Sequence, residues 1–399
     1  MTPDPKSWAD ELEQELLGNI VPFWVRHAFD DESGGLTGGL THDGLRRNEP
    51  RSTVLASRVL WTFSSVASAY PQAEGAAAAA DRAFQVLLSR HADERFGGFY
   101  WSVDAHGEPV DDRKHSYANA FAVYGLIAYS RIRGEAGALS HAQTVFDLLQ
   151  NHAWDGELGG YLEGCSRNWG ALDDFRLSDK EPNVPKTMNT HLHVLEAWTE
   201  LLRETRRPEV AQVHRRTLGI LLGRMRDDRT GHFRQFFERD WTEIPADASY
   251  GHDIEAAWLL RRAAEVDGDP NLADATRQAA VGTADRVLRV ALTPDGAFLY
   301  AGTPDTPKNT NVEWWAQAEA IVGFLDAFEA SGEERFLEAA HRVWRFVREH
   351  VSDPVGGDWI KSQTRNLRLN PNSLRAGPWE CPYHHARMCL EGIRRLRAL

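Results

Sequence analysis

The stretch Asp93-Glu94-Arg95-Phe96-Gly97-Gly98-Phe99 decides how this chain folds, because its pattern recurs along the sequence. Asp155-Gly156-Glu157-Leu158-Gly159-Gly160-Tyr161 repeats the same order of Asp, Gly and aromatic residue. The Asp side chain can bond within a turn, the glycine permits a positive φ, and the aromatic residue suits a short extended segment. Related stretches begin at Asp31, Asp228, Asp295 and Asp353. The turn therefore recurs about every 60 to 70 residues, which indicates a repeat architecture.

Helical patterns fill the intervals between these turns. Apolar residues recur there at spacings of three and four, as in Val145, Leu148 and Leu149. We expect helix pairs at 56–70 and 77–90, 118–131 and 139–152, 191–203 and 209–225, 254–265 and 273–290, and 314–330 and 333–350. A helix at about 7–29 can pair with one at about 385–399 across the closure.

Six such hairpins predict an all-α fold in which an inner circle of helices lies inside an outer one, with the turns and short strands at one end. An open solenoid is the alternative, although solenoids usually show more uniform repeats and polar capping units. No stretch resembles an interdomain linker, and we interpret 165–186 as a loop. We therefore expect one domain over residues 1–399.

The composition excludes several classes of protein. The net charge of -13 argues against nucleic acid as a partner, because such binding depends on clustered Lys and Arg. No apolar run approaches the roughly 20 residues that span a bilayer, and residues 1–8 show no signal peptide. The three cysteines, at 165, 381 and 389, suit a reducing compartment better than a disulfide framework. We expect a cytoplasmic protein, a monomer or a homodimer, that does not bind a membrane.

Two distant stretches, 249–260 and 378–387, each place a histidine at the start of a helical pattern. A breaker, Gly251 or Pro382, comes just before His252 or His384. Each imidazole should therefore lie at a helix N-terminus, at the rim of whatever the helices enclose. Histidine is the side chain best matched to proton transfer near neutral pH, so two that face one cavity could exchange protons with both faces of a substrate.

A third histidine group, Asn189-Thr190-His191-Leu192-His193, opens another predicted helix. Residues 189 and 193 are one turn apart, so Asn189 and His193 can both face a cavity, while His191 is expected to be buried and hydrogen-bonded. We do not expect a metal, because no third ligand stands at a recognised spacing.

Three charged residues add to these candidates. Glu255 follows His252 by three positions, so its carboxylate can approach that imidazole and raise its basicity. Asp253 is interpreted as a first-turn anion that the helix dipole favours. Arg58 lies among apolar residues of a predicted inner helix and needs an oxygen-rich partner, either a ligand or an acidic side chain.

The 14 tryptophans are numerous for this length. Flat aromatic faces can pack against sugar rings, although most aromatic residues serve the core. Trp315 and Trp379 are the strongest candidates for ligand contact, because they neighbour other candidate residues.

Taken together, the motifs resemble the N-acylglucosamine 2-epimerase superfamily, and within it most of all the cellobiose 2-epimerase branch. The motifs that carry the resemblance are Arg58-Val59-Leu60-Trp61-Thr62-Phe63-Ser64, Lys114-His115-Ser116-Tyr117-Ala118-Asn119-Ala120-Phe121-Ala122-Val123-Tyr124, Asn189-Thr190-His191-Leu192-His193, Gly251-His252-Asp253-Ile254-Glu255, Trp314-Trp315-Ala316-Gln317-Ala318-Glu319-Ala320 and Cys381-Pro382-Tyr383-His384. They stand in the family's order from about residue 20 to the C-terminus. The resemblance implies an (α/α)6 barrel, which agrees with the six repeats.

The resemblance also implies roles for individual residues. His252 and His384 match the family's two general acid/base histidines, His193 a third histidine that assists ring opening, and Arg58 the arginine that stabilises an enediolate. Substrate-contacting or supporting positions are matched by Tyr117, Asn189, Glu255, Trp315 and Trp379. His385 stands where the cellobiose-type pattern usually has Asn, and we expect it to influence the choice of substrate at the pocket.

The expected reaction is the epimerisation of a sugar at C2, with no cofactor. The ring opens, one histidine removes the C2 proton, and a second histidine returns a proton to the opposite face of the enediolate. The substrate is a free aldose or the reducing end of a β-1,4-linked disaccharide. Three alternatives stay open: an aldose–ketose isomerase, a glycoside hydrolase that uses Asp173 and Asp174 or Asp253 and Glu255, and a sugar-binding protein without activity.

Overall fold

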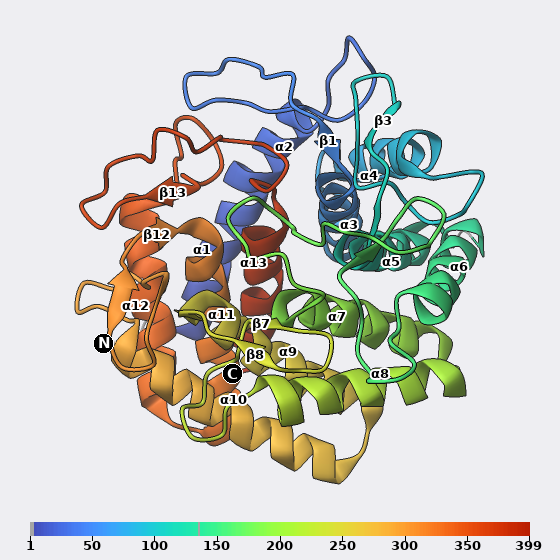
Figure 1. The fold of residues 1–399 in the computed structure, drawn as a ribbon. Coiled ribbons are helices and arrows are strands. Elements are labelled where there is room, and N and C mark those ends of the chain that lie inside the picture. Colours follow the sequence, from blue (N-terminus) through green and yellow to red (C-terminus); the bar gives the residue numbers. More distant parts are fainter. Residues whose placement is uncertain (1–3, 135) are drawn as a thin grey trace.

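A computed structural model describes residues 4–134 and 136–399 of the chain (Figure 1). The helices that form the inner circle are α3 (Thr53–Ala69), α5 (Ser116–Arg133), α7 (Met188–Thr205), α9 (Tyr250–Asp267), α11 (Trp314–Ser331) and α13 (Tyr383–Leu396). The outer helices are α1 (Pro5–Glu15) with α2 (Val21–His27), α4 (Ala76–Val86), α6 (Ala136–His152), α8 (Pro208–Ile220), α10 (Pro270–Val290) and α12 (Glu334–His350). Short π-helical segments extend three of the outer helices, at Leu16–Ile20, Leu87–His91 and Leu221–Met225.

The inner helices close into a ring. Each packs against the next, from α3 to α5, α7, α9, α11 and α13, and α13 packs against α3. Each also packs against an outer helix, and α1 covers α13, so the first and last helices join the two ends of the chain as the sequence predicted. In Figure 1 the colours accordingly run round the ring until red α13 lies beside the blue helices. The fold is an (α/α)6 barrel, and the open solenoid is wrong.

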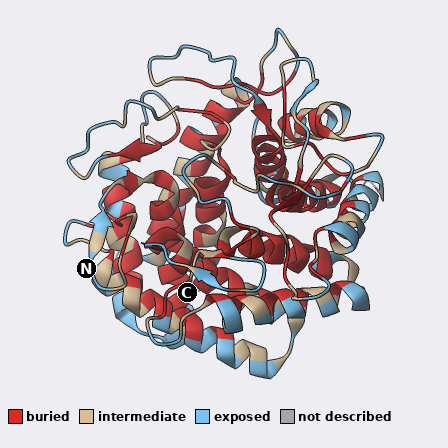
Figure 2. Ribbon diagram, in the orientation of Figure 1, coloured by how far each residue is buried: buried red, intermediate tan, exposed pale blue. Residues whose placement is uncertain are grey.

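Burial separates the two circles. The inner helices are buried on nearly every side, whereas outer helices such as α8 and α10 show an exposed outer face (Figure 2). A helix that is buried all round is a core helix, and one with a single apolar stripe is a surface helix. Within the described residues, no helix is long and apolar enough to cross a membrane.

Short antiparallel strand pairs lie directly before the inner helices α3, α5, α7, α9 and α11. The strand pairs that do so are β1 (Arg51–Ser52) with β2 (Ser102–Val103), β4 (Lys114–His115) with β5 (Gly164–Cys165), β6 (Lys186–Thr187) with β7 (Phe236–Phe237), β9 (Ala248–Ser249) with β10 (Ala301–Gly302), and β12 (Val312–Glu313) with β13 (Ser362–Gln363). The first strand of each pair directly precedes an inner helix, and its partner follows an outer one. Three further strands, β3 (Pro109–Asp111), β8 (Glu243–Ile244) and β11 (Pro307–Asn309), extend three of these pairs. The inner helices therefore begin at the same end of the barrel.

The recurring Asp binds both its own turn and the strand that precedes the next inner helix. Asp93 accepts the backbone N–H groups of Arg95 and Phe96, and it also accepts 2.9 and 3.0 Å bonds from Lys114 and Arg167. Asp155 repeats this arrangement in the next unit, with Lys186 and Arg239. The repeat that the sequence shows as turn chemistry is thus also a buried ion pair between successive units.

Candidate active site

Apart from Trp379, which lies in the loop before α13, the candidate residues lie in the first two turns of the inner helices. Tyr117, Asn189, His252, Trp315 and His384 stand within the first three residues of α5, α7, α9, α11 and α13. Because these helices begin at one end of the barrel, their first turns meet there. The ring therefore collects side chains that are up to 267 positions apart in sequence, from Tyr117 to His384.

His252 and His384 border the same indole. The ring centroid of Trp315 lies 4.7 Å from that of His252 and 5.6 Å from that of His384. Gly251 makes this contact possible, since a Cβ atom there would lie 2.6 Å from the Trp315 ring. Two imidazoles from different helices thus share one wall of a site.

His384 is oriented by a carboxylate. Its Nδ1 lies 2.7 Å from Oε1 of Glu319, which leaves Nε2 for a substrate. Burial lowers the pKa of His384, and the guanidinium groups of Arg58 and Arg387 lower it further. Burial also lowers the pKa of His252 to about 3. Both imidazoles are therefore neutral near pH 7 and able to accept a proton.

The buried side chain of Arg387 connects three carboxylates of the site. Arg387 donates to Glu196, to Glu255 at 2.5 Å and to Glu319 at 2.7 Å. Burial raises the pKa of Glu255 to about 8 and also raises that of Glu319, whereas the nearby guanidinium of Arg387 acts in the opposite direction on both. Ligand atoms of Glu255, Glu319 and His384 lie within 4.8 Å of one another, a spacing that a cation could use. The guanidinium of Arg387 supplies positive charge to these two carboxylates.

His193 and Arg58 lie on the other side of this network. His193 Nδ1 is 2.9 Å from Oε2 of Glu196, which also accepts a 2.6 Å bond from the hydroxyl of Tyr383. Arg58 donates a 2.7 Å bond to the hydroxyl of Tyr117 and contacts Cys381 at 3.6 Å. No carboxylate among the described residues is paired with Arg58, so its charge is available to an oxygen of a ligand.

Trp379 and Asn189 lie toward the mouth of the barrel. The ring of Trp379 is 6.1 Å from that of Tyr117 and 6.0 Å from that of Trp101. Asn189 is half-buried, and its Oδ1 finds no partner in the described part of the chain. A cavity of about 570 Å³ adjoins Trp101 and Trp379, and the loop at 166–185 contributes to its wall. Aromatic side chains with a few unpaired polar atoms are typical of pockets that bind small molecules.

The comparison with known proteins identifies the family. The N-acylglucosamine 2-epimerase family model matches residues 35–388, which is most of the chain. The chain belongs to this family. The cellobiose 2-epimerase of Bacteroides fragilis is 37% identical over 383 residues, which cover 96% of this chain and 97% of that protein.

Solved structures agree with this membership of the epimerase family. The cellobiose 2-epimerase of Bacillus thermoamylovorans superposes with a TM-score of 0.91 at 33% identity, covering 98% of this chain and 99% of that one. A D-mannose isomerase has a TM-score of 0.83 at 21% identity, with 96% and 97% covered, and shows the shared fold alone.

Within this epimerase fold, two expectations about neighbouring residues need correction. Glu255 does not approach His252, whose Nδ1 has no partner in the described chain; Glu255 instead binds Arg387. Residues three apart on a helix can share a face, but at this position the buried guanidinium is the stronger partner. Asp253 is likewise more than a first-turn anion, because it is buried and accepts bonds from His232 and from the backbone of Phe233.

His385 lies outside this cluster, so our expectation that it borders the substrate pocket is wrong. Its imidazole is fully buried, 2.5 Å from Asp358, and stacks on Trp359. Asp358 also accepts a 2.7 Å bond from Lys361. Adjacent residues on a helix point about 100° apart, so His384 faces the site while His385 faces the neighbouring packing layer. His191 behaves as expected, buried and bonded to the backbone of Thr187 and Tyr161.

Four members of the site network were missed from the sequence: Glu196, Glu319, Tyr383 and Arg387. Glu319 lies on α11, whose other side chains are mostly apolar, and a charged residue in such a helix requires a buried partner. The argument that singled out Arg58 could therefore have found Glu319. Helices α7 and α13 carry several polar residues, so Glu196, Tyr383 and Arg387 had no comparable signal.

Replacing Gly251 with alanine tests the packing at the shared indole. The new methyl group would meet the Trp315 ring and the Cβ of Ala316, so the indole must move away from His252. We expect kcat/KM to fall by about 10²-fold, the size of effect that a 1 Å misplacement can have, with the fold retained. Gly219→Ala is the matched control, because a Cβ there meets nothing within 4 Å. Equal activity in the two variants would show that the position of the indole does not matter.

Proposed function

We propose that the chain is a sugar 2-epimerase that interconverts the glucose and mannose configurations at the reducing end of a β-1,4-linked disaccharide such as cellobiose. The observation that carries this proposal is the pair of neutral imidazoles, His252 and His384, on two helices beside one indole. Epimerisation at C2 needs a base on one face of the carbon and an acid on the other. The similarity to cellobiose 2-epimerases supports the choice of substrate.

The other residues fit the remaining steps. In this proposal His193, whose Nδ1 is 2.9 Å from Glu196, assists opening of the sugar ring. The C2 proton is acidic only in the open-chain aldose, so this step must come first. One imidazole then removes that proton, and Arg58 stabilises the charge that develops on the enediolate oxygens. The second histidine, after taking up a proton from solvent, delivers it to the opposite face of C2, which gives the epimer. The first histidine then releases the C2 proton to solvent, and both imidazoles are neutral again.

The mouth of the barrel favours a disaccharide over a free monosaccharide. Trp379 offers a flat face beside Tyr117, and the cavity next to it has room for a second sugar unit. Glu181 belongs to the loop at 166–185 that contributes to the wall of this cavity, and burial raises its pKa to about 7. Aromatic faces and carboxyl groups are the chemistry that binds a sugar ring and its hydroxyls.

The alternatives have less support. A ketose isomerase would form the same enediolate but return the proton to C1. That reaction has no use for a second histidine on the opposite face of C2. A hydrolase needs two available carboxyl groups. Glu255 and Asp253 are instead bound by Arg387 and His232, and Asp174 is paired with Arg176 at 2.7 Å.

Incubation of the enzyme with cellobiose or mannose in heavy water tests the proposal, with products identified by NMR. We expect cellobiose to yield the disaccharide with a mannose reducing end, carrying deuterium at C2. A ketose product would support the isomerase, and free glucose would support the hydrolase. If neither sugar is converted by folded protein, the proposal is wrong.

A further inference from the structure

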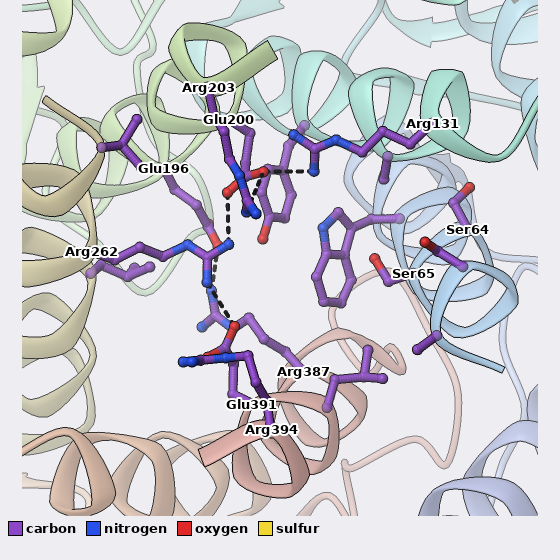
Figure 3. Close-up of a pocket in the computed structure, with 18 of the residues that line it drawn as sticks. Ser64, Ser65, Arg131, Glu196, Glu200, Arg203, Arg262, Arg387, Glu391 and Arg394 are labelled. Carbon is purple, nitrogen blue, oxygen red and sulfur yellow. Dashed lines mark hydrogen bonds and ion pairs between the residues drawn. The ribbon is translucent and has the colours of Figure 1, made fainter. Parts of the chain in front are cut away.

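A second cavity, of about 600 Å³, opens at the other end of the barrel (Figure 3). It is lined by the second halves of α3, α5, α7, α9 and α13. Its inner wall includes Glu196 and Arg387, the residues that contact the histidine site from below. The network thus separates two spaces, and the histidines lie on one side of it.

Arginine side chains converge on this cavity from four helices. Arg131, Arg203, Arg262 and Arg394 extend from α5, α7, α9 and α13 toward two carboxylates, Glu200 and Glu391 (Figure 3). Arg262 bridges the two carboxylates at 2.8 and 2.7 Å, and Arg131 also binds Glu200 at 2.7 Å. The lining also includes Arg387, Glu196 and Glu265, and Arg131 binds Glu204 at 2.9 Å, so most of the charges in the cavity are paired.

Two of the four arginines keep free donors. The contact of Arg203 with Glu200 is 3.9 Å long, and its side chain is 54% exposed. Arg394 binds Glu391 through Nε and one terminal nitrogen, and its side chain is 59% exposed. Neither has a further partner among the described residues. Both line the cavity, so their unused N–H groups are open to an anion that enters it.

Helix dipoles account for only part of this charge. The C-terminal ends of inner helices carry partial negative charge, and arginines in their last turns offset it. Arginines that only offset the charge of helix ends would not require a cavity or an aromatic wall beside them. Here Trp61 stacks on Tyr124, with ring centroids 5.3 Å apart, at the side of the cavity. The buried hydroxyl of Ser64, also at the wall, has no partner in the described chain.

We propose that this cavity binds a small organic anion, whose phosphate or carboxylate group meets Arg203 and Arg394 and whose apolar part packs beside Trp61. Guanidinium groups recognise both kinds of anion through paired N–H donors. The site is separate from the sugar site, because the Glu196–Arg387 network lies between them. Occupation of one should therefore not exclude occupation of the other.

Isothermal titration calorimetry of the full chain with phenyl phosphate and with benzoate tests this proposal at constant ionic strength. We expect one saturable site for at least one of these anions, and saturating cellobiose should not compete with it. The anion that binds identifies the phosphate or the carboxylate as the preferred group. Benzyl alcohol, which lacks the charge, should bind at least 10-fold more weakly.

Two variants test separately how the positive charge and the cavity volume contribute to binding. Arg203→Ala with Arg394→Ala removes the free donors, and Ser65→Phe fills the cavity without changing its charge; each should weaken binding 10-fold or more. Arg345→Ala, on outer helix α12 and 63% exposed, is the control and should bind as the parent does. Absence of saturable binding at millimolar anion, or binding that neither variant weakens, would overturn the proposal. Because binding is measured without turnover, this result is independent of the sugar that the enzyme converts.

Discussion

Arg387→Met is expected to destabilise the protein by about 3–5 kcal/mol, because it removes one partner from a fully buried ionic network. Arg387 is 2% exposed and contacts three carboxylates, those of Glu196, Glu255 and Glu319. Methionine fills similar space but leaves these groups without their cation. The free energy of unfolding, measured with urea, checks the expectation, and exposed Arg345→Ala should change it by less than about 0.5 kcal/mol.

The pH dependence of this variant gives a sharper test. Burial already raises the pKa of Glu255 to about 8, and loss of the guanidinium must raise it further. A carboxyl group whose pKa is higher in the folded state than in the unfolded state costs stability as pH rises above its unfolded value. Arg387→Met should therefore be more stable near pH 5 than near pH 8. Addition of Glu255→Gln and Glu319→Gln should recover part of the lost stability but not the activity. A variant as stable as the parent at both pH values would contradict this account of the network.

The sequence was sufficient for the architecture because the fold is repetitive. The Asp-Gly-aromatic turns and the helical spacing between them predicted the number of hairpins and the pairing of the first and last helices. The ends of the helices were less accurate. For example, the helix predicted at 254–265 begins at Tyr250 in the structure. Gly251, which we expected to precede the helix, lies inside α9. Packing against Trp315 favours glycine at this helical position, and local propensity does not reveal such a contact.

The site was predictable only in part, since its partners are distant in sequence. His252 and His384 were found from local patterns, and the resemblance connected them. The pairing of Glu319 with His384 spans 65 positions and has no local signal. His385 was misplaced for the opposite reason, because proximity in sequence was taken for proximity in the pocket. On a helix, the residue next to a site residue usually faces elsewhere.

His384→Asn and His252→Asn should each greatly slow epimerisation while leaving one half of the proton chemistry intact. If each imidazole serves one face of C2, removal of one should lower epimerisation by about 10²–10⁴-fold, the usual contribution of a general acid or base. The remaining histidine can still remove the C2 proton from the epimer that it faces and return a solvent deuteron to the same face. We therefore expect each variant to exchange the C2 hydrogen of one epimer and not of the other, with opposite choices in the two variants.

The pH at which this exchange slows in acid shows the pKa of the histidine that acts as the base. The pKa of His252 is lowered to about 3 by burial, so in His384→Asn the neutral base persists well below pH 6.5, and exchange falls only as pH drops toward the lowered pKa. NMR of cellobiose and of its epimer in heavy water measures the exchange, with Gly219→Ala as a fully active control. Exchange of both epimers by one variant would mean that a single base reaches both faces of C2. Loss of all exchange in both, with the fold intact, would mean that the two imidazoles act only together. Opposite choices in the two variants would place one histidine on each face of the carbon.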